Sequence, residues 1–524
     1  MVAPPVSRSA APVSRSATAT RPGPLVIATV AILVAATFIP LGYVGWAFAT
    51  TGWSQAYELL ARPRVGELLL NTVGLVVITV PLCVAIGVGV AWLVERTDLP
   101  GCAVWRPLFV APLAIPAFVN SYAWVGMVPS LHGLGGGVLI STLSYFPFVY
   151  LPAAATLRRL DPAVEESARA LGSGSAGVFF RVVAPQLRLA ILGGGLLIGV
   201  HLLAEFGAFA MLRFDTFTTA IFQQFQATFD GAAGSMLAGV LVLCCLVLLV
   251  AEASARGHAR FARIGSGAPR TATPIRLGRM ILPAEAALAA LLVLAVGVPV
   301  WTILRWLWIG GTEVWVLDDI GTALGQTIGL ATAAALLTTV LAFPVAWVAV
   351  RASGVLARVV EGANFVTSAL PGIVTALALV TVTLRVAPPL YQSVVLIVCA
   401  YVLLFMPRAL VSVRAGLAQV PTSLEEASRS LGMSRSTTFL QVTLRLTAPA
   451  AAAGASLVFV AVATELTATL LLAPTGTRTL SMRFWSLASE LDYAGAAPYA
   501  LALVVLAIPV TLVLFRQSTK VAAL

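Results

Sequence analysis

The sequence predicts an all-α membrane protein with twelve transmembrane helices, arranged as two parallel six-helix repeats. Three observations lead to this prediction. The 524 residues are 59% hydrophobic and only 10% charged, whereas a soluble domain carries about 25% charged residues. Apolar stretches long enough to cross a bilayer recur along the whole chain. Two nearly identical charged segments, 165–172 and 425–432, lie between these stretches.

Each predicted span is a helix, because backbone groups surrounded by lipid must be satisfied within their own segment. About 20 apolar residues cross the hydrocarbon core, and the strict alternation of a membrane β-barrel strand does not occur in these stretches. The spans predicted in the first half are Leu25–Ala49, Leu68–Val94, Pro107–Val128, Gly137–Leu157, Leu189–Leu212 and Gly231–Ala251. Those predicted in the second half are Ala286–Leu304, Ile320–Val350, Gly362–Leu384, Val386–Pro407, Ala448–Leu472 and Tyr493–Phe515.

The orientation follows from the basic residues in the loops. If the N-terminus is cytoplasmic, 25 of the 32 lysines and arginines face the cytoplasm and 7 face outward, as the positive-inside rule expects. Both termini and both charged segments are then cytoplasmic. The basic residues are scattered among short loops, so they predict contact with a lipid bilayer and no nucleic-acid partner. The five cysteines show neither metal-ligand spacing nor a disulfide framework.

The same analysis divides the chain into four parts. Residues 1–24 form an Ala/Pro/Ser/Arg tail that cannot bury a core, and a disordered cytoplasmic tail is predicted. A cleaved signal peptide is the alternative, but the first apolar stretch is longer than the roughly 7–15 residues of a signal core. The first six-helix half spans 25–254, a basic cytoplasmic linker 255–280, and the second half 281–524.

The duplication extends far beyond the charged segments. Matching positions keep an offset of 255 through Pro116 and Pro371, and an offset of 260 from the charged segments onward. Six predicted helices separate equivalent points, so the two halves have the same orientation and are related by an axis along the membrane normal. A central pathway is expected at their interface. Further matching pairs are Asn71–Leu75 with Gln326–Leu330, and Glu205 with Glu465.

Each charged segment is predicted to begin as a helix. Asp161-Pro162 supplies an N-cap and a first-turn proline, and Thr422–Glu425 reads as a capping box. A glycine ends each helix after about two turns, and a second short helical stretch follows at 177–183 and 437–445. An amphipathic loop lying on the membrane is the alternative, but two matching copies favour a docking knob for a soluble partner. The predicted docking residues are Glu165, Glu166, Ala168, Gly172, Glu425, Glu426, Ala427 and Gly432.

These segments resemble the Glu-Ala-Ala motif of permease subunits of ABC-type importers. The motif reads Glu166-Ser167-Ala168 and Glu426-Ala427-Ser428, so a serine replaces one alanine in each copy, and Arg445 replaces the final proline of the second copy. A chain with two fused six-helix halves is similar to the type I ferric-iron importer permeases. The stretches Leu203–Gly207 and Glu465–Pro474 are also similar to that subgroup.

The resemblance implies a permease of a bacterial cytoplasmic (inner) membrane. It implies a cytoplasmic ABC ATPase dimer, which binds ATP and Mg and clasps the Glu-Ala-Ala helices, and an extracytoplasmic substrate-binding protein. Ferric iron is the implied cargo, with thiamine, a polyamine or a phosphonate as alternatives. A secondary transporter driven by an ion gradient, or an ion channel, would be another class. Independently of any family, a P-loop needs a lysine on the phosphates, and the single lysine is Lys520 near the C-terminus. The chain is therefore predicted to be no enzyme and to bind no cofactor of its own.

Five residues within apolar spans are candidates for the transport pathway: Glu205, Glu465, His201, Pro116 and Pro371. A carboxylate inside a membrane usually marks function, so both glutamates are predicted to face the interface between the halves, with capping of a broken helix as the alternative. His201 lies one turn before Glu205 and could share a proton with it. The prolines are expected to kink pathway helices. The sequence shows no cluster with metal-ligand spacing.

Overall fold

The structure, a computed structural model, describes residues 23–228, 231–256, 274–352 and 354–523. These residues are almost entirely helical, with one isolated β-bridge between Thr97 and Ile275. In this described part, nine helices are long and apolar enough to cross a membrane, and the number rises to twelve if each of three bent helix pairs is one span. The predicted all-helical fold of two membrane-spanning halves is confirmed. The predicted tail up to residue 22 and the linker residues 257–273 lie outside the described residues.

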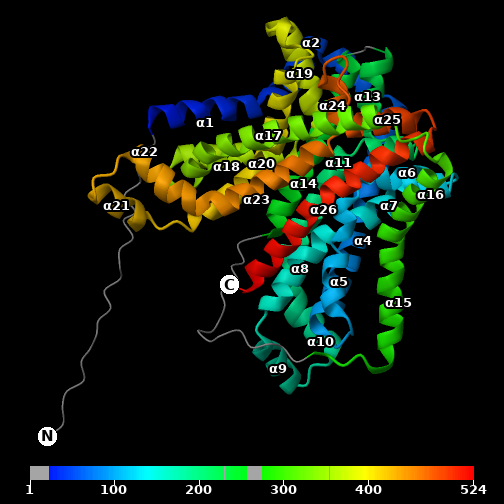
Figure 1. Ribbon diagram of the computed structural model, residues 1–524, viewed down its shortest axis with the longest axis vertical. Coiled ribbons are helices and arrows are strands. Elements are labelled where there is room, and N and C mark those ends of the chain that lie inside the picture. Colours follow the sequence, from blue (N-terminus) through cyan, green and yellow to red (C-terminus); the bar gives the residue numbers. More distant parts are fainter. Residues whose placement is uncertain (1–22, 229–230, 257–273, 353, 524) are drawn as a thin grey trace.

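The helices of the two halves follow one another in the same order (Figure 1). In the first half they are α1 (Pro24–Thr37), α2 (Ile39–Thr51), α3 (Trp53–Leu60), α4 (Pro63–Arg96), α5 (Cys102–Leu108), α6 (Ala117–Met127), α7 (Gly133–Tyr145), α8 (Pro147–Arg159), α9 (Pro162–Ala170), α10 (Ser175–Val178), α11 (Ala184–Ala204), α12 (Gly207–Met211), α13 (Phe217–Gln223) and α14 (Gly231–Arg256). In the second half they are α15 (Ile281–Leu292), α16 (Val298–Gly310), α17 (Leu317–Arg351), α18 (Val355–Ala369), α19 (Gly372–Val386), α20 (Val394–Ala418), α21 (Thr422–Ser430), α22 (Arg435–Thr438), α23 (Leu444–Ala463), α24 (Thr467–Leu472), α25 (Leu480–Ser489) and α26 (Tyr493–Ala523).

The third span of each half is broken rather than straight. The chain turns by 90° between the segment 102–114 and α6, and by 104° between α18 and α19. The predicted spans Pro107–Val128 and Gly362–Leu384 are therefore each two helices. In both halves a proline, Pro116 or Pro371, stands at the break with extended backbone (ψ 143° and 145°). A proline cannot donate its backbone nitrogen to a preceding turn, so each break falls where the sequence lacks that donor.

Three further predicted spans differ from the observed helices. The span Val386–Pro407 is observed as α20, Val394–Ala418, because Pro388 and Pro389 cannot continue a helix and lie in a 3₁₀ turn before it. The spans Leu189–Leu212 and Ala448–Leu472 are interrupted just after Ala204 and Ala463, where short non-helical stretches precede the helices α12 and α24.

The contacts at the two ends of the spans repeat between the halves. At one end, Arg96 pairs with Glu165 and Arg351 with Glu425. At the other end, the first turns of α4 contact the loop before α13, and the first turns of α17 contact the loop before α25. There the ion pair Arg64–Asp215 has its counterpart in Asp319–Arg478, with the two charges exchanged. The same loops are tied by Asn71 Nδ2 to Asp215 O, Phe217 N to Thr72 Oγ1, Arg478 N to Gln326 Oε1 and Leu480 N to Thr327 Oγ1.

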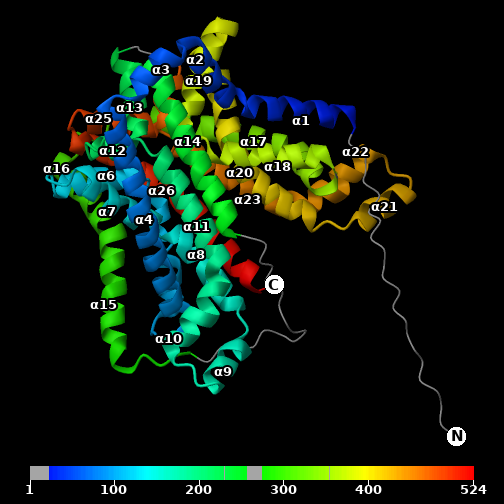
Figure 2. The same ribbon diagram turned by 180° about the vertical axis from the view of Figure 1, so that it is seen from behind.

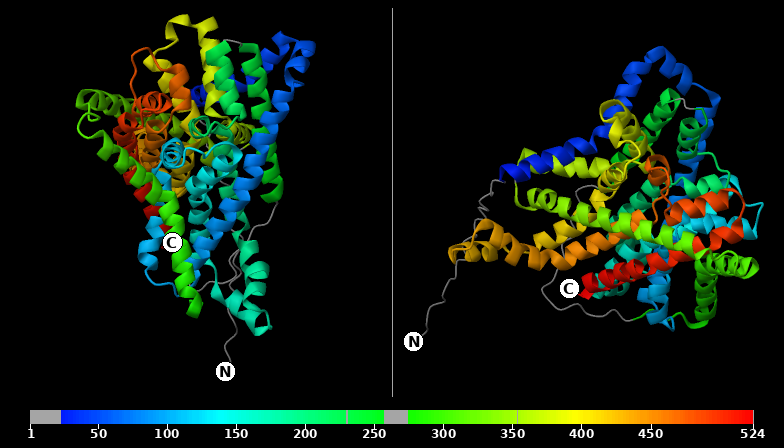
Figure 3. Two further views of the ribbon diagram at one scale, coloured as in Figure 1. Left: turned by 90° about the vertical axis from the view of Figure 1, so that its right-hand side faces the viewer. Right: turned by 45° about the horizontal axis from the view of Figure 1, so that its top comes forward.

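The first span of each half packs on the other half. Helix α1 lies along α17 and α18 (Figure 2), and α2 contacts α19. There the Arg385 guanidinium stacks over the Trp46 ring at 4.1 Å. In the second half, α16 packs against α6 of the first half. Figure 3 shows α15 and α16, in green, on the opposite flank from α2–α4, in blue. Because the first span of each half packs on the other half, these contacts join the two halves at their edges.

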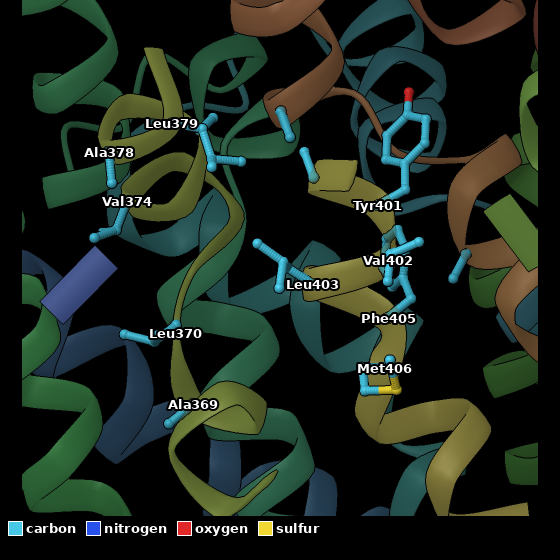
Figure 4. Packing of buried hydrophobic residues seen from close by; sticks show 14 of the residues in the cluster. Ala369, Leu370, Val374, Ala378, Leu379, Tyr401, Val402, Leu403, Phe405 and Met406 are labelled. Atoms are coloured by element: carbon cyan, nitrogen blue, oxygen red, sulfur yellow. The ribbon is translucent and has the colours of Figure 1, made fainter. Parts of the chain in front are cut away.

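The apolar core is continuous from one half to the other. Its largest cluster contains Leu203 and Phe217 of the first half together with Ala331, Tyr401 and other buried residues of the second. Figure 4 shows the part of this cluster where α19 lies beside α20, with Leu379 of α19 and Leu403 of α20 pointing toward the space between the two helices. The broken span is therefore held by packing on both sides of its bend.

Candidate functional site

Two short helical knobs project from the ends of the bundle, as predicted. We define them as residues 161–178 and 421–438. In the first, the Asp161 carboxylate accepts a hydrogen bond from Ala163 N at 3.0 Å and caps α9. Each helix ends at a glycine with a positive φ, +85° at Gly172 and +86° at Gly432, a conformation that costs glycine little.

Two details of the knobs differ from the sequence prediction. The residue that precedes α21 is Pro421, and it makes no side-chain cap, so Thr422–Glu425 is not a capping box. The Glu425 carboxylate instead accepts from Arg351 and the Thr443 hydroxyl, which keeps it from turning back to the start of its helix. The second stretches, 177–183 and 437–445, are not separate helices. They run through the π-helical turns Phe179–Val183 and Phe439–Thr443 into α11 and α23.

The first glutamate of each pair anchors its knob instead of facing outward. Glu165 Oε1 lies 2.7 Å from Arg96 Nη2, and the two side chains are 8% and 5% exposed. The equivalent distance from Glu425 to Arg351 is 3.4 Å. Arg96 and Arg351 are the last residues of α4 and α17, so each ion pair ties a knob to the long helix that precedes the broken span. Glu165 and Glu425 therefore bind arginines within the protein and hold the knobs in place.

The outward faces of the knobs carry the remaining candidate residues. Glu166, Glu426, Ala427, Gly172 and Gly432 are exposed, and Ala168 is half-buried. Two leucines at equivalent positions also face solvent, Leu171 with 87% and Leu431 with 81% of its surface exposed. A single exposed leucine is common on protein surfaces, but here one recurs at the equivalent position of each knob, as two copies of one interaction site would require. The two knobs lie at separate extremities of the molecule (Figure 1).

A cavity of about 500 Å³ lies between the halves. Its wall comes from the end of α11 and from α12 in the first half, and from α18, α20 and the α23–α24 break in the second. The polar residues that line it include Glu205, Glu465, His201 and Arg408. Gly372 and Phe118 also line the wall, so Pro371 directly precedes a lining residue in sequence. Four of the five pathway candidates therefore belong to, or directly adjoin, one cavity shared by both halves, and Pro116 lies two residues from its wall.

Glu205 and Glu465 have equivalent geometry at the helix breaks. Glu205 Oε1 accepts from Ala208 N at 2.9 Å, and Glu465 Oε1 accepts from Ala468 N at 2.8 Å. Each carboxylate thus caps the short helix that follows it, where the helix dipole also favours a negative charge. The Tyr145 hydroxyl donates to the second oxygen of Glu205 at 2.9 Å. The two readings of the sequence are compatible, since both glutamates cap broken helices and both line the interface cavity.

His201 faces the second half rather than Glu205. Its Nδ1 lies 2.7 Å from the Leu197 carbonyl oxygen, and its Nε2 lies 3.5 Å from Arg408 Nη2. The ring packs on Phe148 with centroids 4.8 Å apart. Among the described residues no hydrogen bond joins His201 to Glu205, so the proton-sharing pair suggested by their spacing is not formed. The described part of the chain also contains no group of three or more His, Cys, Asp or Glu side chains that could hold a metal ion.

Sequence reasoning missed three functional or anchoring arginines. Arg96 and Arg351 are separated by the same offset of 255 as the other matching positions of the first spans, and this match was the signal for two equivalent ion pairs. Arg408 lies one residue beyond the predicted span Val386–Pro407, whereas α20 continues through Pro407 to Ala418.

Comparison with known proteins identifies the family. A family model described as the inner membrane component of binding-protein-dependent transport systems matches residues 101–256 and again residues 339–522. Each match covers the latter part of one half, including its broken span, its knob and its cavity glutamate. The repeat found within the sequence therefore corresponds to two copies of one family unit.

Individual relatives agree with this match. The Fe(3+)-transport system permease protein FbpB 2 of Haemophilus influenzae is 36% identical over 480 residues, covering 90% of this chain and 94% of the relative. The sulfate transport system permease protein CysW of a Synechocystis species is 31% identical over 203 residues, which is 34% of this chain and 72% of that protein. CysT of Escherichia coli is 26% identical over 233 residues, or 40% and 83% of the two chains.

Proposed function

Because this chain belongs to the family of inner membrane components of binding-protein-dependent transport systems, we propose that it forms the pathway of an ATP-driven importer for ferric iron. It is a multi-pass transport subunit without its own nucleotide site. ATP and Mg bind to a separate ATPase dimer in the cytoplasm, and an extracytoplasmic substrate-binding protein delivers the cargo. Both termini and both knobs face the cytoplasm.

The observation that carries the coupling proposal is the duplicated outward face of the knobs. Glu166 with Leu171, and Glu426 with Leu431, present a carboxylate and an exposed leucine from equivalent positions. Protein–protein contacts combine an apolar centre with a polar rim, and the leucine near a carboxylate on each knob matches this pattern. The ion pairs of Arg96 with Glu165 and of Arg351 with Glu425 fix each knob to a long helix, so that a movement imposed on the knob is transmitted to that helix.

The iron assignment is supported by a relative. The Haemophilus influenzae protein that is aligned over nine-tenths of this chain is named a permease for Fe(3+). The sulfate permeases share only one half at lower identity. Ferric iron is a hard cation that prefers oxygen ligands, and the cavity between the halves offers the two glutamate carboxylates. Glu205 and Glu465 line the path, and the breaks at Pro116 and Pro371 provide the joints around which the third spans change direction.

The test is reconstitution with the cognate ATPase and binding protein. The permease alone is expected to show no ATPase activity, whereas the assembled complex hydrolyses ATP faster when the iron-loaded binding protein is added. Glu166→Ala combined with Glu426→Ala is expected to weaken ATPase binding and uncouple transport, and Leu171→Ala with Leu431→Ala is expected to do the same. Glu490→Ala removes an exposed carboxylate at the other end of the bundle and serves as the matched control.

The outcomes separate the parts of the proposal. Unchanged ATPase binding and unchanged uptake in both double variants would refute docking through the knobs. Uptake that follows an ion gradient and ignores ATP would refute the ATP-driven mechanism. Identification of the ligand held by the cognate binding protein tests the cargo, and thiamine, a polyamine or a phosphonate there would replace iron.

A further inference from the structure

Arg408 is a cation in the middle of the bundle that forms no direct ion pair with any carboxylate of the described residues. It lines the cavity between the halves and is exposed within it. One N–H reaches His201 Nε2 at 3.5 Å, and the guanidinium lies over the Phe405 ring at 5.2 Å. Within the described residues, no carboxylate lies within 4.0 Å of it. A guanidinium has five N–H donors, so most of them are available to the cavity.

The nearby carboxylates form hydrogen bonds with groups other than Arg408. Both oxygens of Glu205 accept hydrogen bonds, one from Ala208 N and the other from the Tyr145 hydroxyl. Glu465 is held by Ala468 N at the start of α24. A charged side chain in a membrane span is costly and typically faces a water-filled cavity on a substrate pathway. The position of Arg408 fits a ligand-binding role better than a structural ion pair.

His201 orients this arginine. A carbonyl oxygen can only accept, so the contact with Leu197 O places the ring proton on Nδ1 and leaves Nε2 as an acceptor. Nε2 then accepts from Arg408. A histidine in this tautomer, facing a guanidinium, is not free to bind a metal cation. Pro147 and Pro407 match at an offset of 260, so the first-half residue equivalent to Arg408 is Phe148, which also packs against the His201 ring.

We propose that Arg408, positioned by His201, is an oxyanion-binding site within the transport pathway. The proposal rests on the proposed function, because it takes the cavity as the route of the cargo. A guanidinium binds the two oxygens of a carboxylate or phosphate side by side, whereas it repels a bare cation. Ferric iron therefore passes this point as a complex whose oxyanion ligands offset its charge.

A chemical protection experiment tests the site directly on the wild-type protein. Phenylglyoxal modifies guanidinium groups, and mass spectrometry reports the rate at Arg408 and at Arg414, which lies on the same helix, pairs with Glu361 and does not line the cavity. In the assembled transporter, citrate or ferric citrate is expected to slow the modification of Arg408 several-fold and to leave Arg414 unchanged.

The two probes distinguish the source of the anion. Protection by ferric citrate at concentrations at which free citrate has no effect supports an oxyanion that enters as a ligand of the iron. Protection by free citrate alone supports a site that takes the anion independently. Modification of Arg408 at the same rate with and without both probes, or equal slowing at Arg414, would overturn the proposal.

Variants give a second measurement. Arg408→Gln is expected to lower ATP-driven iron uptake about tenfold, equivalent to about 1.4 kcal/mol, with partial recovery in Arg408→Lys and near-normal uptake in Arg414→Gln. If wild-type uptake is ATP-driven and Arg408→Gln equals it, the oxyanion site is wrong and the proposed function stands. If the wild type itself shows no ATP-driven uptake, the proposed function fails instead. His201→Ala should abolish the protection of Arg408 by ferric citrate, and His201→Gln, which retains an acceptor, should restore it. Full protection in His201→Ala would contradict the positioning role.

Discussion

Replacing Glu165 by glutamine should loosen the first knob, although the substitution adds no bulk. The carboxylate lies 2.7 Å from Arg96 Nη2, both side chains are less than a tenth exposed, and the second partner, Arg169, is 3.6 Å away and largely solvated. Loss of one partner from a buried ion pair costs about 3–5 kcal/mol, because the other charge stays buried and unpaired. The knob lies at the edge of the molecule, so about 3 kcal/mol is the appropriate figure. At about 1.4 kcal/mol per factor of ten, local opening should become about 100-fold more frequent.

Amide hydrogen exchange measured by mass spectrometry on the segment 161–178 reads out this opening. The control is Glu166→Gln, an exposed neighbour for which the change should stay within about 0.5 kcal/mol. Combining Glu165→Gln with Arg96→Gln should cost less than the sum of the two single variants, because they share one interaction. Equal exchange in Glu165→Gln and the wild type, or equal opening in the two glutamine variants, would refute the assignment of Glu165 as an anchor.

Two further predictions concern the interface between the halves. Gly207→Ala should destabilise the protein by about 1–3 kcal/mol, because the added Cβ would lie 2.8 Å from Leu466 of the other half. Gly193→Ala, where nothing lies within 4 Å, is the control, and a midpoint of thermal unfolding equal in the two variants would contradict the close approach. Pro371→Ala and Pro116→Ala should each cost only about 0.4–1 kcal/mol, through the greater freedom of the unfolded chain, since packing on both sides keeps the break. A loss of several kcal/mol in the same measurement would show that the proline itself maintains the bend.

The helical class, the duplication and the ends of the two knob helices could be predicted because each depends on local composition. Apolar length predicts a span, and a glycine after a charged turn predicts a helix end, as at Gly172 and Gly432. The direction in which the chain continues after a helix break could not be predicted. Hydropathy is the same for a straight helix and for one that turns by 104°, and the turn at Pro371 depends on residues that pack against it from elsewhere in the chain.

Some residues of the candidate site could be predicted from the sequence, and the roles of others could not. Glu205 and Glu465 were found because a repeated carboxylate in an apolar run is conspicuous, and the structure places both at one cavity. The paired glutamates of the knobs look alike in sequence, yet Glu165 is buried and Glu166 is exposed. Only the position of Arg96, 69 residues earlier in the chain, separates their roles, and a non-local partner of this kind has no signature in the segment itself.

The departures from symmetry are as informative as the repeat. The equivalent glutamates cap equivalent helices, so the halves share a means of shaping the cavity. The pair His201 and Arg408, by contrast, has Ala461 and Phe148 at the matching positions of the other half. The stability of a duplicated bundle alone does not require an arginine that forms no direct ion pair within the described residues, on one side of a shared cavity, where a charge is costly. An asymmetric cargo, with an anionic side to be held while its cationic centre passes the carboxylates, gives that residue a function.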